Sequence, residues 1–308
     1  MAYKLKDDEA LAEGVRRIAR AELVEAIEIA KGTREVDNTP VHETRKHLKK
    51  ARAALRLVRK EIGRSLFRQQ DHRLRDIGHL VSEVRDAEVR LQTVRELQSI
   101  QPRRGRVSYR QLEQMLMIEL ENFMAAFAEW QAQALPLLEQ AKAAVDSWPV
   151  DHFDTAQLRR AVQASYKRAR SCLAEARKNL TSQAFHDFRT EAKVLTYQLR
   201  ILRPINPVVL KNLCEEVEAI GDLLGRAHDL FFLGDRLRGD RGHAPWQREG
   251  HKLLAVLEVS QSDLQRAAAD LAERFFAERP RGFGERVATW LNNWTASRSS
   301  SVAEALVT

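Results

Sequence analysis

The chain has 308 residues, 44% hydrophobic and 31% charged, with only 13 glycines and 8 prolines. This composition disfavours an architecture of short strands and turns, and no apolar run reaches the roughly 20 residues that cross a bilayer. The two cysteines, Cys172 and Cys214, lie in no CxxC or Cys/His cluster, which excludes a disulfide framework and argues against a zinc site. The first residues lack the apolar segment of a secretory signal, so we expect a cytoplasmic protein without a membrane span.

Helical periodicity covers nearly the whole chain, and no segment alternates as a strand does. In the first half it predicts helices over 8–31, 40–62, 66–97 and 108–145, the last bent at Pro136. Residues 146–154 are the predicted boundary between the two halves. After it, helices are predicted over 155–180, 183–203, 207–238, 245–278 and 282–296. Gly32 is a predicted C′ glycine, and Thr39 a predicted N-cap.

The basic residues are concentrated in two of these helices. The net charge is +8, from 51 Lys and Arg against 43 Asp and Glu. Residues 42–60 carry eight basic residues and one acidic residue, a net charge of +7. Residues 186–203 carry four and two, a net charge of +2, which leaves −1 for the rest of the chain. Such local excess argues for an anionic partner without naming it.

The same two helices belong to an internal repeat. His42-x-x-Arg45-x-x-x-Lys49 recurs 144 residues later as His186-x-x-Arg189-x-x-x-Lys193. In the following helix, Ile77-Gly78 and Asp86 recur 143 residues later as Ile220-Gly221 and Asp229. Agreement over successive helices predicts an all-α fold of two four-helix bundles related by a pseudo-twofold axis. We expect residues 1–148 to form the first repeat and residues 149–308 the second.

Each basic helix has two faces. In the first, apolar positions spaced three or four apart form the predicted core face: Val41, Thr44, Leu48, Ala51, Leu55 and Val58. A second stripe, about 25 Å long, is basic and is flanked by Lys46, Lys50 and Lys60. Its members are His42, Arg45, Lys49, Arg52, Arg56 and Arg59. Like charges at this spacing destabilise a helix. A face that is merely solvated would gain nothing that offsets this cost. The stripe therefore favours an anion-binding site, with arginine and lysine suited to phosphate oxygens.

The second copy carries fewer basic residues. Its predicted core face is Phe185, Phe188, Ala192, Leu195, Leu199 and Leu202. Its basic stripe is His186, Arg189, Lys193, Arg200 and Arg203, with Tyr197 beside it and with Asp187 and Glu191 diluting the charge. His42 and His186, near predicted helix N-termini, are interpreted either as phosphate ligands or as neutral structural imidazoles.

The segments VHETRKHLKKARAALRLVR (41–59) and FHDFRTEAKVLTYQLRIL (185–202) resemble the CHAD family of conserved-histidine α-helical domains. LRDIGHLVSEVRDAEV (74–89) and IGDLLGRAHDL (220–230) support the resemblance, which covers nearly the whole chain. It implies two pseudo-symmetric helical bundles around a basic cavity that binds polyphosphate and, in some members, a location on polyphosphate or storage granules. No strand-rich region accompanies it, so the chain is similar to stand-alone members.

The resemblance assigns the polyphosphate-binding residues. They are His42, Arg45, Lys46, Lys49, Arg52, Arg56, His186, Arg189, Lys193 and Arg200, with secondary contributions from Arg16, Arg20, Arg168 and Arg170. Two departures, Thr196 in place of a basic residue opposite Arg52 and Glu191 within the second stripe, put an equal contribution from both halves in doubt. We therefore expect the first helix to dominate the affinity.

Three other functions remain open. His186-Asp187 and His228-Asp229 are dipeptides of the kind found in helical metal-dependent phosphohydrolases, but no set of nucleophile, base and metal ligands accompanies them. Nucleic acid would suit the charge, yet aromatic residues are 6% of the chain and only Tyr197 lies beside a basic stripe. An acidic protein is the third possible partner. We expect no catalytic residue, metal or cofactor.

Overall fold

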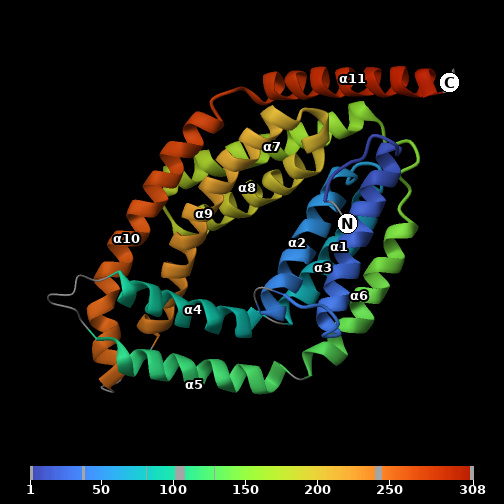
Figure 1. Cartoon of the computed structure of the whole chain (residues 1–308). Coiled ribbons are helices and arrows are strands. Elements are labelled where there is room, and N and C mark those ends of the chain that lie inside the picture. The colour runs from blue at the N-terminus through green and yellow to red at the C-terminus, as the bar shows by residue number, and fades with distance from the viewer. Residues whose placement is uncertain are drawn as a thin grey trace.

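The computed structural model describes residues 3–36, 39–80, 82–100, 108–127, 129–239 and 245–305. Within these ranges the chain forms eleven α-helices, one short 3-10 helix and no strand (Figure 1), which confirms the all-α prediction. None of the helices in these ranges is both long enough and apolar enough to span a membrane.

The first half of the chain supplies six helices. They are α1 (Leu11–Ala30), α2 (Pro40–Leu57), α3 (Gly63–His79), α4 (Ser82–Ser99), α5 (Arg110–Phe127) and α6 (Trp130–Asp146). The second half supplies five, with the 3-10 helix after the second of them. They are α7 (Thr155–Asn179), α8 (Ser182–Leu202), η1 (Arg203–Ile205), α9 (Pro207–Arg238), α10 (Pro245–Phe275) and α11 (Pro280–Ala305).

Two helices of the first half are shorter than the sequence pattern predicts. The helix expected over 66–97 is divided into α3 and α4, and the Ser82 hydroxyl donates to the carbonyl oxygen of His79 (2.9 Å) at the break. Such a side-chain bond competes with the helical ladder. The helix expected over 108–145 is divided into α5 and α6 before Trp130, whereas Pro136 lies inside α6. The corresponding helices of the second half, α9 and α10, are continuous.

The predicted ends of α1 and α2 are confirmed. Gly32 has φ +72°, and its N–H donates to the carbonyl of Ile29 (3.0 Å) while that of Thr33 donates to the carbonyl of Glu28 (3.0 Å). This is a Schellman motif, in which glycine takes the left-handed position without strain. The Thr39 hydroxyl accepts from the backbone N–H of His42 (3.3 Å) as the N-cap of α2.

The two halves meet where α2 packs against α8. The side-chain amide of Gln198 on α8 donates to the carbonyl of Ala53 on α2 (3.3 Å), and both residues are buried. The N-terminal segment crosses the same junction, because the Leu5 N–H donates to Ile201 (3.0 Å) and the Tyr3 hydroxyl donates to the Lys50 carbonyl (2.9 Å). The second basic helix is therefore fixed directly beside the first.

A hydrophobic core runs through both halves, and a second, smaller one joins them at the far end. The smaller core combines residues of α4, α5, α9 and α10, among them Val94, Leu112, Leu233 and Leu257. In Figure 1, α4 and α5 reach from the α1–α3 side of the molecule to α9 and α10. This crossing brings α4 to the edge of the space between α2 and α9. The predicted repeat boundary at 148/149 lies in the connection between α6 and α7 and stays a prediction.

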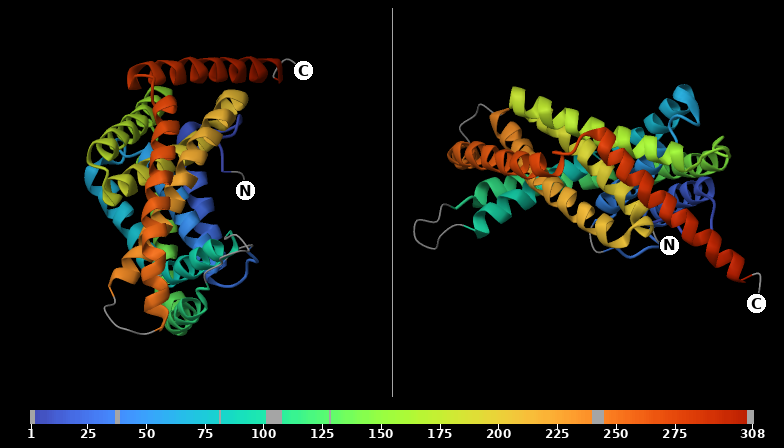
Figure 2. Two further views of the ribbon diagram at one scale, coloured as in Figure 1. Left: turned by 90° about the vertical axis from the view of Figure 1, so that its left-hand side faces the viewer. Right: turned by 90° about the horizontal axis from the view of Figure 1, so that it is seen from above.

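One aromatic contact fixes the last helix. Figure 2 shows α11 lying across the ends of the α7–α9 layer. Tyr166 on α7 is buried and stacks on Phe283 of α11 with ring centroids 4.2 Å apart. Its hydroxyl donates to the carbonyls of Phe275 (3.2 Å) and Glu278 (3.1 Å) in the turn between α10 and α11. Burial without water at the hydroxyl raises the pKa of Tyr166 to about 12.

Candidate functional site

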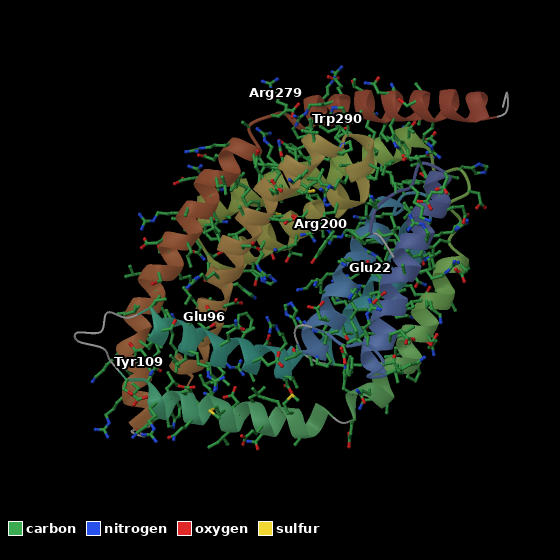
Figure 3. All side chains as sticks on the ribbon, viewed as in Figure 1. Glu22, Glu96, Tyr109, Arg200, Arg279 and Trp290 are labelled. Carbon is green, nitrogen blue, oxygen red and sulfur yellow. The ribbon has the colours of Figure 1, made fainter. Side chains whose placement is uncertain are left out.

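The two basic helices are held in place by the apolar faces that the sequence predicts. All six core positions of α2 are buried, and so are all six of α8. The basic residues consequently point away from the core. Figure 3 shows nitrogen-tipped side chains extending into the space between α2, α4, α8 and α9.

Five cations from three helices are gathered at this place, and we call them the central basic cluster. They are Arg45 and Lys49 of α2, Arg85 of α4, and Arg189 and Lys193 of α8. Each of the other four lies near enough to Lys49 to act electrostatically on its ammonium group. Among the described residues, Arg45, Lys49 and Arg189 form no ion pair. The cluster therefore holds positive charges of both halves that no carboxylate directly neutralises.

Lys49 is the most perturbed member of the cluster. Its side chain is exposed, although many protein atoms surround its ammonium group. Loss of hydration, followed by repulsion from Arg189, Arg45, Lys193 and Arg85, lowers its pKa to about 7. A nearby anion would reverse both effects, because it would favour the charged form.

Arg189 and Lys193 lie against a glycine-lined face of α9. A Cβ atom at Gly221 would come within 2.9 Å of the Lys193 Cε, and one at Gly225 within 3.5 Å of an Arg189 guanidinium nitrogen. The glycines thus leave room for the two cations beside the helix backbone. Among the described residues, the Arg189 Nε is buried without a hydrogen-bond partner, and Lys193 pairs with the exposed Asp222 (3.0 Å). An unpartnered buried donor is costly, and a bound oxygen acceptor would relieve that cost.

Two carboxyl groups border the cluster at equivalent positions of the repeat. Asp86 of α4 lies near Arg45, and Asp229 of α9 lies near Arg189. Burial raises the pKa of both carboxyl groups, although the neighbouring arginines act in the opposite direction. Arg45 is also held by the carbonyl of Gly78, which accepts from its Nη1 (2.9 Å). These contacts orient the arginines without forming close ion pairs.

The two predicted histidines have different surroundings. His186 faces His228 of α9, with their Nδ1 atoms 3.3 Å apart and their ring centroids 4.5 Å apart. Burial and Arg189 lower the pKa of both, that of His228 to about 3, so this pair is neutral at pH 7. His42 lies among Arg85, Lys49 and Lys46, and burial with these charges lowers its pKa as well. A neutral imidazole carries one N–H, so the member of the His186 and His228 pair that donates to the other has none left. The other member and His42 can each offer a hydrogen bond to an anion without adding charge.

Comparisons with known proteins agree with this arrangement. The family model of the CHAD domain matches residues 17–238, which include all of the central basic cluster. This chain belongs to the CHAD domain family. No curated protein sequence matches it.

Two solved structures share the fold of this CHAD domain. PptA from Streptomyces chartreusis superposes with a TM-score of 0.62 at 13% identity, covering 87% of this chain and 99% of that one. The CHAD domain from the plant Ricinus communis superposes with a TM-score of 0.58 at 19% identity, covering 95% of each chain. At these identities the likeness establishes the fold alone.

Arg52 and Arg56, also assigned to the site from the sequence, are engaged elsewhere in this CHAD domain. Arg52 forms two hydrogen bonds to Asp71 of α3, at 2.8 and 3.1 Å. Arg56 donates to both carboxylate oxygens of Glu191 on α8, at 2.7 and 2.8 Å. Glu191 thus neutralises Arg56 of the opposite half, as well as Arg168 of α7 (3.2 Å). The pair of Arg56 and Glu191 ties the two halves together.

The remaining assigned residues are also paired. Lys46 contacts Glu43 (2.9 Å) at the edge of the cluster, and Arg200 contacts Glu218 (2.7 Å) near the end of α8. On α1, Arg16 binds Asp151 (2.8 Å) and Arg20 binds Asp146. The structure does not bring Arg16 or Arg20 to the central basic cluster.

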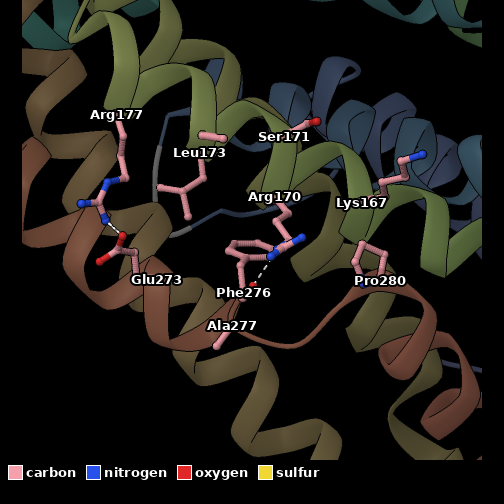
Figure 4. A pocket seen from close by; sticks show the side chains of 10 residues that line it. Lys167, Arg170, Ser171, Leu173, Arg177, Glu273, Phe276, Ala277 and Pro280 are labelled. Atoms are coloured by element: carbon pink, nitrogen blue, oxygen red, sulfur yellow. Dashed lines mark hydrogen bonds and ion pairs between the residues drawn. The ribbon is translucent and has the colours of Figure 1, made fainter.

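Arg170 lies in a separate pocket of about 720 Å³ between α7 and the α10–α11 turn. Figure 4 shows its guanidinium directed at this turn, where Nε donates to the carbonyl of Phe276 (2.9 Å). Arg177 pairs with Glu273 in the same pocket. Arg170 therefore braces the turn and does not reach the central basic cluster.

The expected dominance of the first basic helix stays a prediction. The +7 of residues 42–60 is partly offset by neighbouring carboxylates, since Asp71 and Glu191 take two arginines and the buried Glu22 contacts Lys50 (3.2 Å) and His47 (2.6 Å). Each of the two helices contributes two cations to the central basic cluster.

Sequence reasoning missed Arg85 and His228 as site residues. They occupy equivalent positions of the repeat, directly before Asp86 and Asp229, and both face the cluster. The signal was the recurrence of polar residues on the helix that follows each basic helix. Within the described ranges, His, Cys, Asp and Glu side chains form no group of three or more that could hold a metal ion.

The pairing of Arg56 leads to a prediction about stability. Replacing Arg56 with alanine should lower the free energy of unfolding by about 1–3 kcal/mol, because Glu191 loses its bidentate partner at a site where both side chains are under 20% exposed. Urea unfolding measures this loss, with the exposed Arg64→Ala as the control. Unchanged stability together with weaker polyanion binding would instead make Arg56 a ligand.

Proposed function

We propose that this protein binds inorganic polyphosphate, without cleaving it, at the central basic cluster. The observation that carries the proposal is Lys49, an exposed lysine whose ammonium group is repelled by four cations and is free of ion pairs among the described residues. Like charges gathered in this way cost stability unless an anion binds between them. Natural selection of such an arrangement is best explained by a polyanion ligand.

The arrangement of the cluster favours a flexible chain. The cations around the exposed Lys49 come from α2, α4 and α8, so a ligand that contacts several of them must reach across helices of both halves. A polyphosphate chain offers closely spaced anionic oxygens to both faces at once. Each contact is a charge-assisted hydrogen bond, and several along one chain reinforce one another. The chain belongs to the CHAD family, and resemblance to that family implies polyphosphate binding. This membership supports the same ligand.

Nucleic acid fits the site less well. Single strands are held mainly by bases stacking on open aromatic faces. Tyr197, the aromatic residue beside the second stripe, packs edge-on against Tyr3 with centroids 6.2 Å apart. The Arg200 guanidinium lies over its ring at 5.8 Å. One face of the Tyr197 ring is therefore covered by a guanidinium group.

A competition titration tests the proposed ligand. The full chain is loaded with fluorescent single-stranded or duplex DNA, and long-chain polyphosphate is added; a reverse titration starts from labelled polyphosphate. We expect polyphosphate to displace both DNAs and neither DNA to displace polyphosphate, with an affinity that falls steeply with salt. DNA that displaces polyphosphate at equal phosphate concentration would reject the proposal in favour of nucleic acid.

Absence of catalysis is part of the proposal. His186 and His228 meet at the cluster, but Asp187 is exposed and accepts a hydrogen bond from Gln183 (2.8 Å). Asp187 is therefore engaged outside the contact between the two histidines. Gel electrophoresis of long-chain polyphosphate incubated with the protein and Mg²⁺ or Mn²⁺ should show unchanged chain length. Shortening that depends on His186 and His228 would contradict this part.

The proposal extends to location and partners. A protein retained by polyphosphate in the cell should lie on polyphosphate granules. A fluorescent fusion should lose that location when the cells are depleted of polyphosphate. Partners that remain bound after polyphosphatase treatment would instead indicate an acidic protein as the ligand.

A further inference from the structure

A second basic pocket lies beside the central basic cluster, at the end of α8. Its volume is about 400 Å³, and it is bordered by the N-terminal segment, α2, α8, η1 and the start of α9. The basic residues in its lining are Lys4, Lys50, Arg200, Arg203 and Lys211. Two carboxylates, Glu215 and Glu218, lie among them. We call it the Arg203 pocket.

The charges of the Arg203 pocket are only partly compensated. Glu218 pairs with Arg200 (2.7 Å), while Glu215 contacts Lys211 at 3.7 Å with both side chains more than half exposed. A contact of this kind contributes little and leaves the lysine available. Among the described residues, Lys4 and Arg203 form no ion pair. The pocket therefore has a surplus of exposed cations that an anion could use.

One face of α8 connects the pocket with the central basic cluster. Arg189, Lys193, Tyr197 and Arg200 follow one another at intervals of three or four residues, over roughly 16 Å of helix. Burial raises the pKa of the Tyr197 hydroxyl, and Arg200 and Arg189 both act on it from opposite ends. The phenol thus lies between the two groups of cations. Figure 3 labels Arg200 on α8 and Glu22 on α1, which lie on either side of the contact between the two halves.

We propose that the Arg203 pocket is a second phosphate-binding subsite, which takes the segment of a polyphosphate chain that extends beyond the central basic cluster along α8. This inference rests on the proposed function. A chain long enough to reach both places gains the second set of contacts intramolecularly, at a high effective concentration. A short chain fills the central basic cluster alone. The pocket therefore sets a preference for long chains.

The test compares two probes on a charge-reversal variant, Arg203→Glu with Lys211→Glu. Both side chains are exposed, so the fold should be retained, as a thermal melt will show. Isothermal titration calorimetry then measures tripolyphosphate and long-chain polyphosphate. We expect the affinity for the long chain to fall about tenfold, as reversal of two exposed charge contacts allows. The affinity for tripolyphosphate should stay within about twofold.

A matched control carries Lys252→Glu and Arg266→Glu on α10, which change the net charge equally outside the pocket lining. The subsite proposal would be overturned if the Arg203→Glu, Lys211→Glu variant bound long-chain polyphosphate as tightly as this control does. It would also be overturned if that variant lost affinity equally for both probes. A different result would show that the proposed function itself is wrong. In that case the double variant Lys49→Ala with Arg189→Ala would bind tripolyphosphate as tightly as the parent.

Discussion

Replacing Lys49 and Arg189 together with alanine is expected to weaken the binding of long-chain polyphosphate by roughly a hundredfold or more. In the proposed complex each residue supplies a charge-assisted hydrogen bond to phosphate, and such a bond contributes about 1.5 kcal/mol or more. Two of them correspond to about two decades in the dissociation constant. Calorimetric titration of the double variant measures the loss. The two side chains come from opposite halves, so the variant tests both basic helices at once.

The same variant should be no less stable than the parent protein. Both side chains lie off the buried faces of their helices, and their removal relieves repulsion within the central basic cluster. The control is Lys60→Ala with Arg64→Ala, which removes the same charge from exposed positions. We expect the control to bind within a few-fold of the parent, as long-range electrostatics allow. Parent-like binding by the cluster variant would show that the ligand lies elsewhere.

The affinity for polyphosphate should fall as the pH rises above about 7. In the free protein, burial and four neighbouring cations lower the pKa of Lys49 to about 7. A bound polyanion favours the charged ammonium group, so the pKa in the complex lies higher. Affinity is therefore full below the free pKa and declines between the free and the bound pKa. Uptake of one proton sets the limiting slope at about tenfold per pH unit.

Titrations in buffers of different ionisation enthalpy will detect this proton directly. The comparison belongs above about pH 7.5, where terminal phosphate groups with a pKa near 6 are already ionised. The control is Lys49→Arg, since the guanidinium remains charged throughout this range. This variant should bind polyphosphate with an affinity that no longer depends on pH there. If the affinities of the parent and of Lys49→Arg changed equally with pH, the proton would belong to another group.

Local sequence patterns predicted the basic helices accurately for a physical reason. The side chains that bury α2 and α8 follow the helical period, so the opposite faces could be identified without the fold. The caps at Thr39 and Gly32 depend on a few neighbouring residues, and both are confirmed. The internal repeat predicted equivalent positions for the two helices. Their direct contact is a finding of the structure, in which Gln198 of α8 donates to the carbonyl of Ala53 on α2.

The pairing of the cations could not be predicted from the sequence. Asp71 lies 19 residues from Arg52, and Glu191 lies 135 residues from Arg56. Glu191 seemed to dilute its own helix, but it neutralises an arginine of the other one. The break between α3 and α4 was missed because periodicity continues on both sides of it. That break directs α4, and with it Arg85, toward the site.

The most direct measurement is a crystal structure of the full chain with long-chain polyphosphate. Our account predicts phosphate density between α2 and α8, with oxygens in contact with the Lys49 ammonium and the Arg189 guanidinium. Continuation of this density along α8 toward Arg203 would support the second subsite. Phosphate bound at other residues while the central basic cluster carries none would contradict the account.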